Sequence, residues 1–392
     1  MKKVILFITA IVAVNTMFSS KAFGHSETSA PAILSEAAIV IDSKTGTVLY
    51  DKNSDVKMYP ASLTKIATAV YAIEAGDLGD VVTVSSKARN IEGTRVYLEE
   101  GEQVTLKKLL QGLLINSGND AGVAIAEHLS GSVESFSSDI NNYLKNVIGV
   151  QNSNFQNPHG LFNPNHVTTA EDLAKITQYA MKNQVFREIF GTKELKWGGE
   201  SWDTTIYTHH KLMRENVYKG VTGGKTGYVD QSGFTLATTA KRENLSLIVI
   251  TLNSNSQSVA YNDTINLLDY GFDNFKTASI SKGSTFTLGE KAYKASKKVY
   301  FTQSINAKLS KEVKEDGILE VLNQEGTVIA SFPLDKIRKK NNKTIDVQDL
   351  NTKGVSTGSR SILGEYLPKL VFVAISIALS IFGIFHSKIR RL

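Results

Sequence analysis

The sequence has no cysteine among its 392 residues, which excludes disulfides, thiolate metal sites and a cysteine nucleophile. Exported proteins often carry disulfides, so a chain without them is more typical of a bacterial exterior where the hydrophobic core provides the stability. Metal-ligand spacing is also absent, because the adjacent pair His209 and His210 is not part of a His-Glu-x-x-His or similar motif. We therefore expect neither a metal site nor any other cofactor.

The body of the chain has no excess of positive charge. The formal net charge of +6 includes three basic residues in each of two end segments, and the residues between them sum to zero. The six residues are Lys2, Lys3, Lys21, Lys388, Arg390 and Arg391. The positive charge therefore marks the two ends and does not indicate a nucleic-acid-binding surface, so no nucleic-acid partner is expected.

Residues 1–24 have the order of features that is typical of a secretory signal peptide. Lys2 and Lys3 precede an apolar run over 4–14, and small residues surround the end of the segment at Gly24. This order predicts export of the protein and cleavage near Gly24.

A second apolar run, residues 370–385, lies near the C-terminus and has apolar side chains all round a helix. Such a helix rises about 24 Å, less than the roughly 30 Å of a bilayer core, but flanking residues extend it. We expect a polar linker over 351–366 and a transmembrane anchor over 367–387, with the basic tail in the cytoplasm. A helix that lies in the membrane surface is the alternative that the short length leaves open.

Between these ends the sequence predicts two folded domains. Strand patterns occur first, at 37–42 and 47–52, and helix patterns follow at 61–76, 105–116, 120–131 and 168–183. Strand patterns return at 223–229, 234–240 and 245–252, and a final helix pattern covers 260–275. This order predicts an α+β domain over 25–276, in which an antiparallel sheet is flanked by helices. Residues 277–350 alternate as strands do and predict a small C-terminal all-β domain.

The tripeptide Lys-Thr-Gly occurs twice, at 44–46 and at 225–227. The first copy joins the two strand patterns of a hairpin, and Gly46 supplies the positive φ that such a turn needs. The second copy lies on a strand beside the predicted sheet pair, so it is the copy that we expect in a functional site.

Ser62 and Lys65 lie three residues apart at the start of a helix pattern, which places both side chains on one helix face. A serine hydroxyl becomes a good nucleophile only when a base removes its proton. A lysine acts as that base when it is neutral, which requires burial or a neighbouring cation. Lys225 is the candidate for that cation.

Each of these motifs has a simpler interpretation when it is taken alone. Ser62 is then a helix-capping serine and Lys65 a solvated lysine. Ser117 and Asn119 form a turn between two helices, and Lys225 is a surface lysine on a strand. The combination of the three motifs, each at an element boundary, favours a catalytic site over these interpretations.

Together the motifs resemble those of the penicillin-binding, active-site-serine family, with its Ser-x-x-Lys, Ser-x-Asn and Lys-Thr-Gly sets. The stretches PASLTKIATA, INSGNDAGVAIAEH, FQNPHGL and GGKTGYVDQSGFTLATTA are most similar to low-molecular-weight D-alanyl-D-alanine carboxypeptidases. The likeness covers roughly residues 30–276, and the small β domain and C-terminal anchor match the layout of that family.

The resemblance implies a role for each residue of the motifs. Ser62 attacks the D-Ala-D-Ala peptide bond, Lys65 is its general base, and Ser117 passes a proton to the departing D-alanine. Asn119 holds an amide of the substrate. Lys225 and Thr226 meet the terminal carboxylate of the substrate. The backbone N–H groups of Ser62 and Tyr228 form the oxyanion hole, and Gly227 lets the acyl chain lie along the strand edge. The implied partners are the peptidoglycan stem pentapeptide and β-lactam antibiotics, which acylate Ser62.

Water must then hydrolyse the acyl-enzyme. Serine β-lactamases of the first class use a loop glutamate, and the only nearby candidates here are Glu171 and Asp172, without the expected Glu-x-x-Leu-Asn context. We therefore expect slow release of a penicilloyl adduct, with a β-lactamase as the nearest rival. A non-catalytic peptidoglycan-binding protein and a metal-dependent carboxypeptidase are the other rivals. His159 lies in the loop that the family places under the site, and a turn histidine bonded to backbone is its simpler interpretation.

Overall fold

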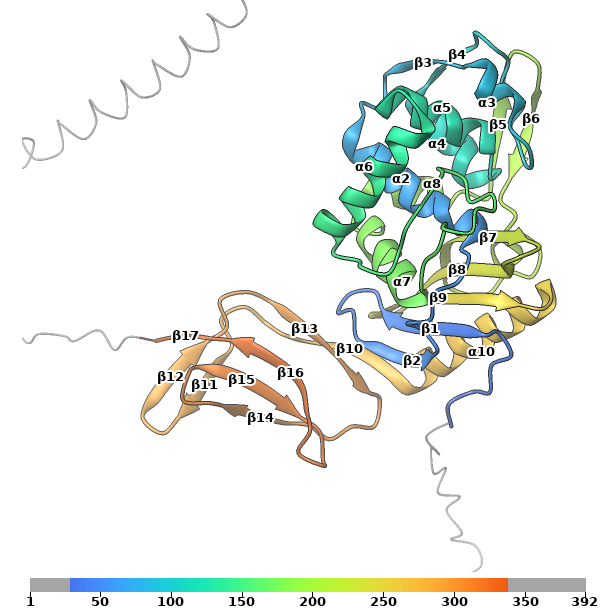
Figure 1. The fold of residues 1–392 in the computed structure, drawn as a ribbon. Coiled ribbons are helices and arrows are strands. Elements are labelled where there is room, and N and C mark those ends of the chain that lie inside the picture. Colours follow the sequence, from blue (N-terminus) through green and yellow to red (C-terminus); the bar gives the residue numbers. More distant parts are fainter. Residues whose placement is uncertain (1–28, 338–392) are drawn as a thin grey trace, which may run out of the picture. The chain divides into compact units, whose positions relative to one another are not determined.

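A five-stranded antiparallel sheet is the centre of the structure, a computed structural model that describes residues 29–337 (Figure 1). Its strands, in the spatial order β2-β1-β9-β8-β7, are β1 (Ala37–Asp42), β2 (Val48–Lys52), β7 (Val221–Val229), β8 (Gly233–Arg242) and β9 (Leu245–Ser254). All four neighbouring pairs are antiparallel, as the sequence predicts. β7 is therefore an edge strand, with β8 as its neighbour in this sheet.

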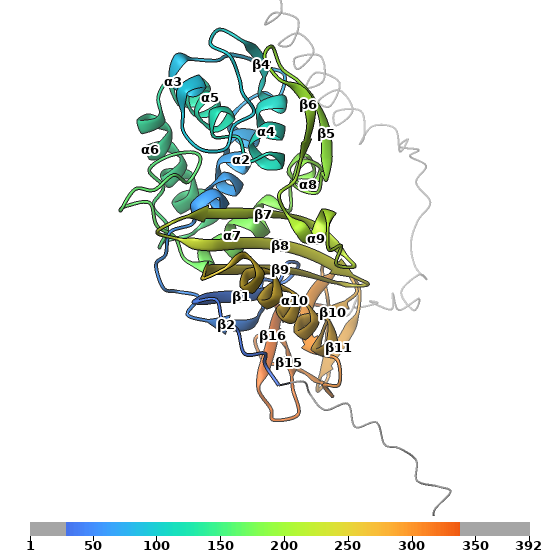
Figure 2. The ribbon, with the colours of Figure 1, turned by 90° about the vertical axis from the view of Figure 1, so that its right-hand side faces the viewer.

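Helices cover both faces of this sheet (Figure 2). On one face, α10 (Gln257–Asn274) packs Leu267 and Leu268 against Val249 and other residues of β1 and β9. On the opposite face, α7 (Ala170–Ala180) contacts β9 and β1. Because successive side chains of a strand point to opposite faces, both covered faces require apolar residues, which explains the continuous apolar run AAIVI over residues 37–41 of β1.

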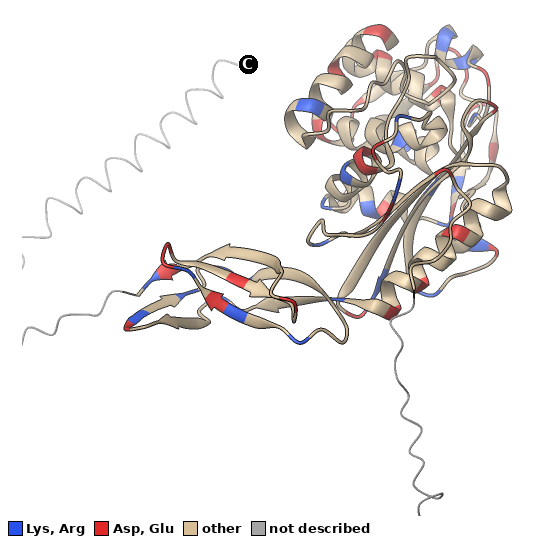
Figure 3. Cartoon of the chain, turned by 60° about the horizontal axis from the view of Figure 1, so that its bottom comes forward, with Lys and Arg blue, Asp and Glu red and all other residues tan. Residues whose placement is uncertain are grey.

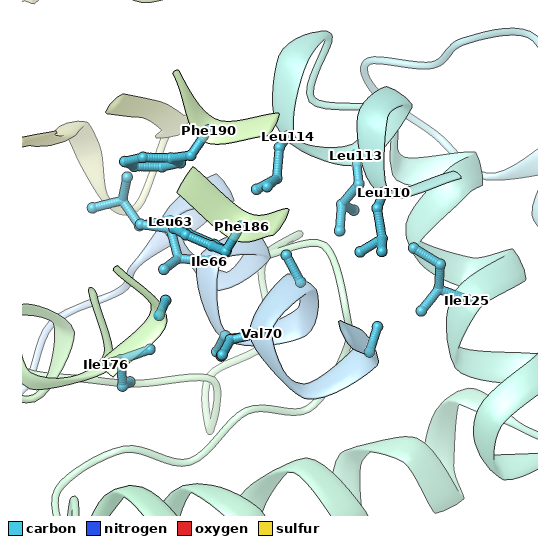
Figure 4. Close-up of a cluster of buried hydrophobic side chains, with 14 of the residues drawn as sticks. Leu63, Ile66, Val70, Leu110, Leu113, Leu114, Ile125, Ile176, Phe186 and Phe190 are labelled. Carbon is cyan, nitrogen blue, oxygen red and sulfur yellow. The ribbon is translucent and has the colours of Figure 1, made fainter. Parts of the chain in front are cut away.

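The α2 helix (Thr64–Ala75) is the centre of the helical part of the molecule (Figure 4). Ile66 and Val70 pack there against Leu110, Ile125 and Phe186 from three other helices. The other helices of this part are η1 (Ala61–Leu63), α3 (Ser86–Asn90), α4 (Leu106–Ile115), α5 (Asn119–Ser130), α6 (Val133–Tyr143), η2 (Leu144–Ile148) and α8 (Gln184–Phe190), whereas α9 (Lys211–Arg214) packs against β7. Two hairpins, β3 (Val81–Thr83) with β4 (Gln103–Thr105) and β5 (Glu194–Gly198) with β6 (Asp203–Tyr207), complete this part.

The residues after α10 form short strands with a core of their own, which includes Ile280, Phe301, Leu319 and Val321. The strands are β10 (Phe275–Ile280), β11 (Thr285–Leu288), β12 (Lys291–Lys294), β13 (Val299–Ser304), β14 (Ser310–Val313), β15 (Ile318–Leu322), β16 (Val328–Pro333) and β17 (Asp335–Lys336). They agree with the strand patterns expected in this region. β10 follows α10 without a linker, so the strands begin two residues before the expected boundary at residue 277.

The two predicted membrane-related segments, residues 1–24 and 367–387, lie outside the described residues, as does the linker over 351–366. Within residues 29–337, no helix combines the length and the apolar character that crossing a bilayer requires. Lysine and arginine are interspersed with aspartate and glutamate along the same residues (Figure 3).

Candidate active site

Ser62 does not cap the helix that it precedes. It lies in the 3₁₀ turn η1, and α2 begins two residues later with Leu63 as its N-cap and no side-chain cap hydrogen bond. The Ser62 Oγ atom instead accepts a hydrogen bond of 2.9 Å from the Lys65 Nζ atom. The capping interpretation of Ser62 is therefore wrong, and the predicted contact between the two side chains is present.

Lys65 is fully buried in the first turn of α2, so it is not a solvated lysine. Its Nζ atom lies 2.8 Å from Asn119 Oδ1 and 2.8 Å from the carbonyl oxygen of His159, in addition to Ser62. These two oxygens can only accept. When the amine is neutral, its two hydrogens satisfy them and its lone pair faces the Ser62 hydroxyl, the one neighbour of the three that can also donate.

The electrostatic surroundings favour that neutral form. Burial lowers the pKa of Lys65 well below its usual 10.5, and the nearby positive charge of Lys225 lowers it further, while Asp120 acts in the opposite direction. Desolvation disfavours a charged amine because the buried site replaces little of the lost hydration. The amine that contacts the nucleophile is thereby prepared to accept a proton.

Asn119 is held in one orientation by the loop before β4. Its Nδ2 atom donates to the carbonyl oxygen of Glu92 at 2.7 Å, which leaves Oδ1 directed at Lys65. Its backbone N–H donates to the Thr94 carbonyl at 2.7 Å. Asn119 begins α5 after a break from α4 in which Ser117, 4% exposed, has a φ of +64°. The turn interpretation and the site interpretation of Ser117 are thus both consistent with the chain path.

Asp120 connects this turn to the extended segment 94–98. Its carboxylate accepts hydrogen bonds from the N–H groups of Val96, Leu98 and Ala121 at 2.9–3.2 Å. The sequence analysis did not single out Asp120. Its place in the first turn of α5 suggests an acidic helix start, but no local pattern indicates partners more than twenty residues away.

Lys225 lies on the edge strand β7 and is only 3% exposed, so the interpretation as a surface lysine is wrong. Burial lowers the pKa of Lys225 to about 7. Its Nζ atom donates to the carbonyl oxygen of Thr226 at 2.8 Å. Tyr228, one residue beyond Gly227, is 52% exposed and lies next to the last residue of the same strand.

Glycine is required at two positions by the close approach of β7 and the loop 157–161 to Ser62. A Cβ atom on Gly227 would lie 2.8 Å from the Ser62 backbone nitrogen and 2.5 Å from Thr235 Oγ1. A Cβ atom on Gly160 would lie 1.9 Å from the Ala61 carbonyl oxygen. Ser62 N–H belongs to the first turn of η1, where a backbone N–H has no partner within the helix. The β7 backbone at Gly227 therefore lies beside the Ser62 N–H, which is available to a ligand.

Two buried histidines in the loop beneath the site support its backbone. The carbonyl of His159 contacts Lys65, while its Nδ1 atom accepts from the Leu161 N–H at 3.2 Å, so the turn interpretation of His159 holds for its side chain. His166 was not identified from the sequence. Its Nδ1 atom accepts from the Gln156 N–H at 3.0 Å, which leaves Nε2 as the donor to Thr64 Oγ1 at 2.7 Å.

The two carboxylates considered for water activation are bound elsewhere. Glu171 pairs with Lys175 at 2.7 Å, and the Asp172 carboxylate accepts from Asn152 N–H and Ser153 Oγ, both at 2.8 Å. Both residues serve the start of α7, where negative charge is favourable.

A serine hydroxyl that contacts a buried amine of lowered pKa, beside a backbone N–H without a partner in its own helix, is arranged for nucleophilic acyl transfer. The fold and these residues therefore define a serine acyl-transferring hydrolase.

Comparison with known proteins gives the particular family. Residues 25–256 match the peptidase S11 family model, described as D-alanyl-D-alanine carboxypeptidase. The chain is 34% identical over 273 residues to the D-alanyl-D-alanine carboxypeptidase DacF of Bacillus subtilis (strain 168), covering 68% of this chain and 70% of that protein. It is 33% identical over 290 residues to DacC of Escherichia coli (strain K12), covering 69% and 70%.

Solved structures agree with this result. Penicillin binding protein 5 from Haemophilus influenzae superposes with a TM-score of 0.69 at 26% identity, over 78% of this chain and 97% of that chain. Penicillin binding protein 6B from Escherichia coli gives 0.67 at 26% identity, over 78% and 96%. The chain belongs to the D-alanyl-D-alanine carboxypeptidase family of low-molecular-weight penicillin-binding proteins, as its motifs predict.

Proposed function

We infer that the protein is a serine-type carboxypeptidase that removes the terminal D-alanine from peptidoglycan pentapeptide stems. The observation that carries this inference is the contact of the Ser62 hydroxyl with a buried Lys65 amine whose other two neighbours only accept hydrogen bonds. In the acylation step, Ser62 Oγ bonds to the carbonyl carbon of the scissile peptide while Lys65 takes the hydroxyl proton. The N–H groups of Ser62 and Tyr228 stabilise the negative charge that develops on the carbonyl oxygen.

The remaining residues of the motifs bind the substrate and complete the proton transfer. Lys225 and Thr226 meet the terminal carboxylate, and Ser117 passes a proton to the nitrogen of the departing D-alanine. Asn119 has one amide hydrogen and one oxygen lone pair beyond those used by Glu92 and Lys65, so it retains capacity for an amide of the substrate. Gly227 lets an extended peptide lie along the edge of β7.

Hydrolysis of the acyl-enzyme by water regenerates Ser62 and gives a carboxypeptidase. We propose that a β-lactam acylates the same residue and leaves slowly, because the nearby acidic residues Glu171 and Asp172 are engaged at the start of α7. Steady, rapid nitrocefin turnover by the purified protein would instead favour a β-lactamase.

We also propose the cellular setting that the sequence predicts. Residues 1–24 direct export, residues 25–276 form the catalytic domain, and residues 277–350 form the small β domain. The linker over 351–366 and the anchor over 367–387 hold the protein at the cell membrane with its tail in the cytoplasm. Protease accessibility of the two ends in intact cells tests this topology.

The catalytic proposal is tested with the Ser62→Ala variant of the full-length protein. We expect release of D-alanine from a pentapeptide to fall at least about 10³-fold, and the penicilloyl adduct on the Ser62 peptide to disappear from mass spectra. Ser54→Ala is the matched control, because Ser54 and Lys57 have the same spacing but Ser54 Oγ contacts Asp51. A Ser62→Ala protein that releases D-alanine at the parent rate would disprove the mechanism.

A further inference from the structure

The first Lys-Thr-Gly, residues 44–46, does more than close the β1–β2 hairpin. Gly46 has a φ of +78°, as the turn requires. Thr45 Oγ1 lies 2.5 Å from Thr302 Oγ1 on β13, and Thr302 also donates to Asp42 Oδ2 at 2.7 Å. The turn is therefore bound to the strands that follow α10, and its lysine projects at this junction.

Two ammonium groups flank one aromatic ring at the junction. Lys44 Nζ lies 4.5 Å, and Lys298 Nζ 5.1 Å, from the centre of the Tyr300 ring. Both lysines are exposed, and neither forms an ion pair with any residue in the part of the chain that the structure describes. The ring attracts both cations but neutralises neither.

Two cavities adjoin this arrangement, and both are lined by Lys44, Lys298 and Tyr300. One has a volume of ≈ 380 Å³, and its remaining lining residues are polar or charged: Lys241, Glu243, Asn244, Ser246, Thr277 and Ser279. The other has a volume of ≈ 390 Å³ and adds apolar residues that include Ile280, Val299, Leu319 and Phe332. The polar cavity contains three lysines against one glutamate, which is an excess of two positive charges.

We propose that this junction binds a phosphate ester with an apolar substituent. Lysines act as point charges toward phosphate, and the hydroxyls of Ser246 and Ser279 supply further donors to its oxygens, whereas the Thr277 hydroxyl donates to Asp42. A planar carboxylate is more often bound by the bidentate fork of an arginine, and no arginine lines either cavity. The apolar cavity receives the substituent, because the two cavities share the residues that bind the phosphate. Both volumes lie within the range of small-molecule sites.

The proposal is tested by calorimetric titration of the full-length protein in a neutral detergent. Phenyl phosphate is the first probe, with inorganic phosphate and phenylacetate as comparators. We expect phenyl phosphate to bind more tightly than either comparator, and the double variant Lys44→Ala/Lys298→Ala to weaken its binding at least about tenfold. The matched control is Lys145→Ala/Lys193→Ala, which removes the same charge from exposed lysines elsewhere. D-alanine release by both double variants should equal that of the parent.

The proposal is overturned by no binding of phenyl phosphate, by equal loss in the two double variants, or by equal binding of phenylacetate. A titration of penicillin-treated protein distinguishes this site from the carboxylate site around Lys225. Loss of the signal after acylation would place the probe in the active site and also overturn the proposal. Further titrations compare glycerol phosphate oligomers with phosphatidylglycerol bilayer discs. Tighter binding of the discs supports the proposal and assigns the site to a lipid headgroup, whereas tighter binding of the oligomers, which have no apolar substituent, would overturn it.

Discussion

Two buried lysines contribute to the dependence of this protein's stability on pH. Burial lowers the pKa of Lys65 well below 10.5 and that of Lys225 to about 7, whereas both have ordinary values in the unfolded chain. Between about pH 7 and 10, the unfolded state therefore binds more protons than the native state. Through these two groups the free energy of unfolding rises with pH across this window, because deprotonation removes the cost of neutralising the two amines.

A Lys65→Met variant should show a smaller rise. Methionine fills a similar volume without a charge to desolvate, so we expect the variant to be more stable than the parent at pH 7, by about 1–3 kcal/mol. Urea unfolding at pH 7 and pH 9 measures both effects, with the exposed Lys145→Met as the control. A parent whose stability falls over this interval, relative to the control, would contradict the neutral state of Lys65.

Gly227 is predicted to be as important as the residues that react. In Gly227→Ala, the new methyl group meets the Ser62 backbone nitrogen at 2.8 Å, and backbone cannot move aside as a flexible side chain can. We expect β7 to shift from η1 and penicillin acylation of Ser62 to slow at least about 10²-fold, with a loss of stability of only about 1–3 kcal/mol. Stopped-flow kinetics measure the acylation rate and thermal unfolding measures the stability, so the two effects are separated. Gly198→Ala, with no atom within 4 Å of the added carbon, should acylate at the parent rate.

At the scale of elements, the wall of the site is held by hydrogen bonds between segments. Asp120 binds the N–H groups of Val96 and Leu98, which are buried, so their loss of a partner is costly. Asp120→Asn replaces one accepting oxygen by a donor that faces these N–H groups. We expect a loss of about 2–4 kcal/mol and slower acylation, because the segment 94–98 that Asp120 holds also binds the Asn119 N–H through the Thr94 carbonyl. Asp139→Asn controls for the lost charge, because within residues 29–337 the one hydrogen bond of the Asp139 carboxylate is with Ser130 near the surface. Equal stability of the two variants would contradict this role.

The sequence predicted elements well where one local signal was sufficient. The periodicity over 61–76 and the apolar run at 245–252 correspond to α2 and β9. Residues 184–220 were not assigned, because α8, α9 and the β5–β6 hairpin are short and depend on packing: Phe186 and Trp197 are buried only through their neighbours. Helix propensity also gave no sign that a separate 3₁₀ turn at 61–63 precedes α2. Because of this turn, Ser62 does not occupy the N-cap position of the helix.

The candidate site was predictable as a set of motifs but not as a set of contacts. Ser62 and Lys65 share a face by their spacing alone, so their contact followed from helix geometry. The partners of Lys65 in Asn119 and in the carbonyl of His159 come from positions 54 and 94 residues away. Such contacts depend on the tertiary fold, and a backbone carbonyl has no residue type that a sequence pattern could indicate.

At the scale of the molecule, Asp42 couples the sheet to the strands that follow α10. Its buried carboxylate accepts from Thr277 Oγ1 at 2.6 Å and from Thr302 Oγ1 at 2.7 Å. In Asp42→Ala both hydroxyls lose this acceptor, so we expect the thermal transition to broaden or divide and proteolysis near residues 275–280 to accelerate. D-alanine release should stay within about twofold of the parent, since the altered contacts lie outside the active site. A single sharp transition with unchanged proteolysis would show that the two parts are coupled by other contacts.

The edge position of β7 carries a risk of self-association between copies of the protein. Natural sheets usually blunt an outer strand with prolines, bulky charges or a covering segment, which prevents pairing between copies of the protein. Here the edge strand β7 contains no proline and its one lysine, Lys225, is buried, and any device that shielded the edge would also close the route by which an extended peptide enters. Self-association at high concentration and access of the substrate therefore compete for the same row of backbone groups.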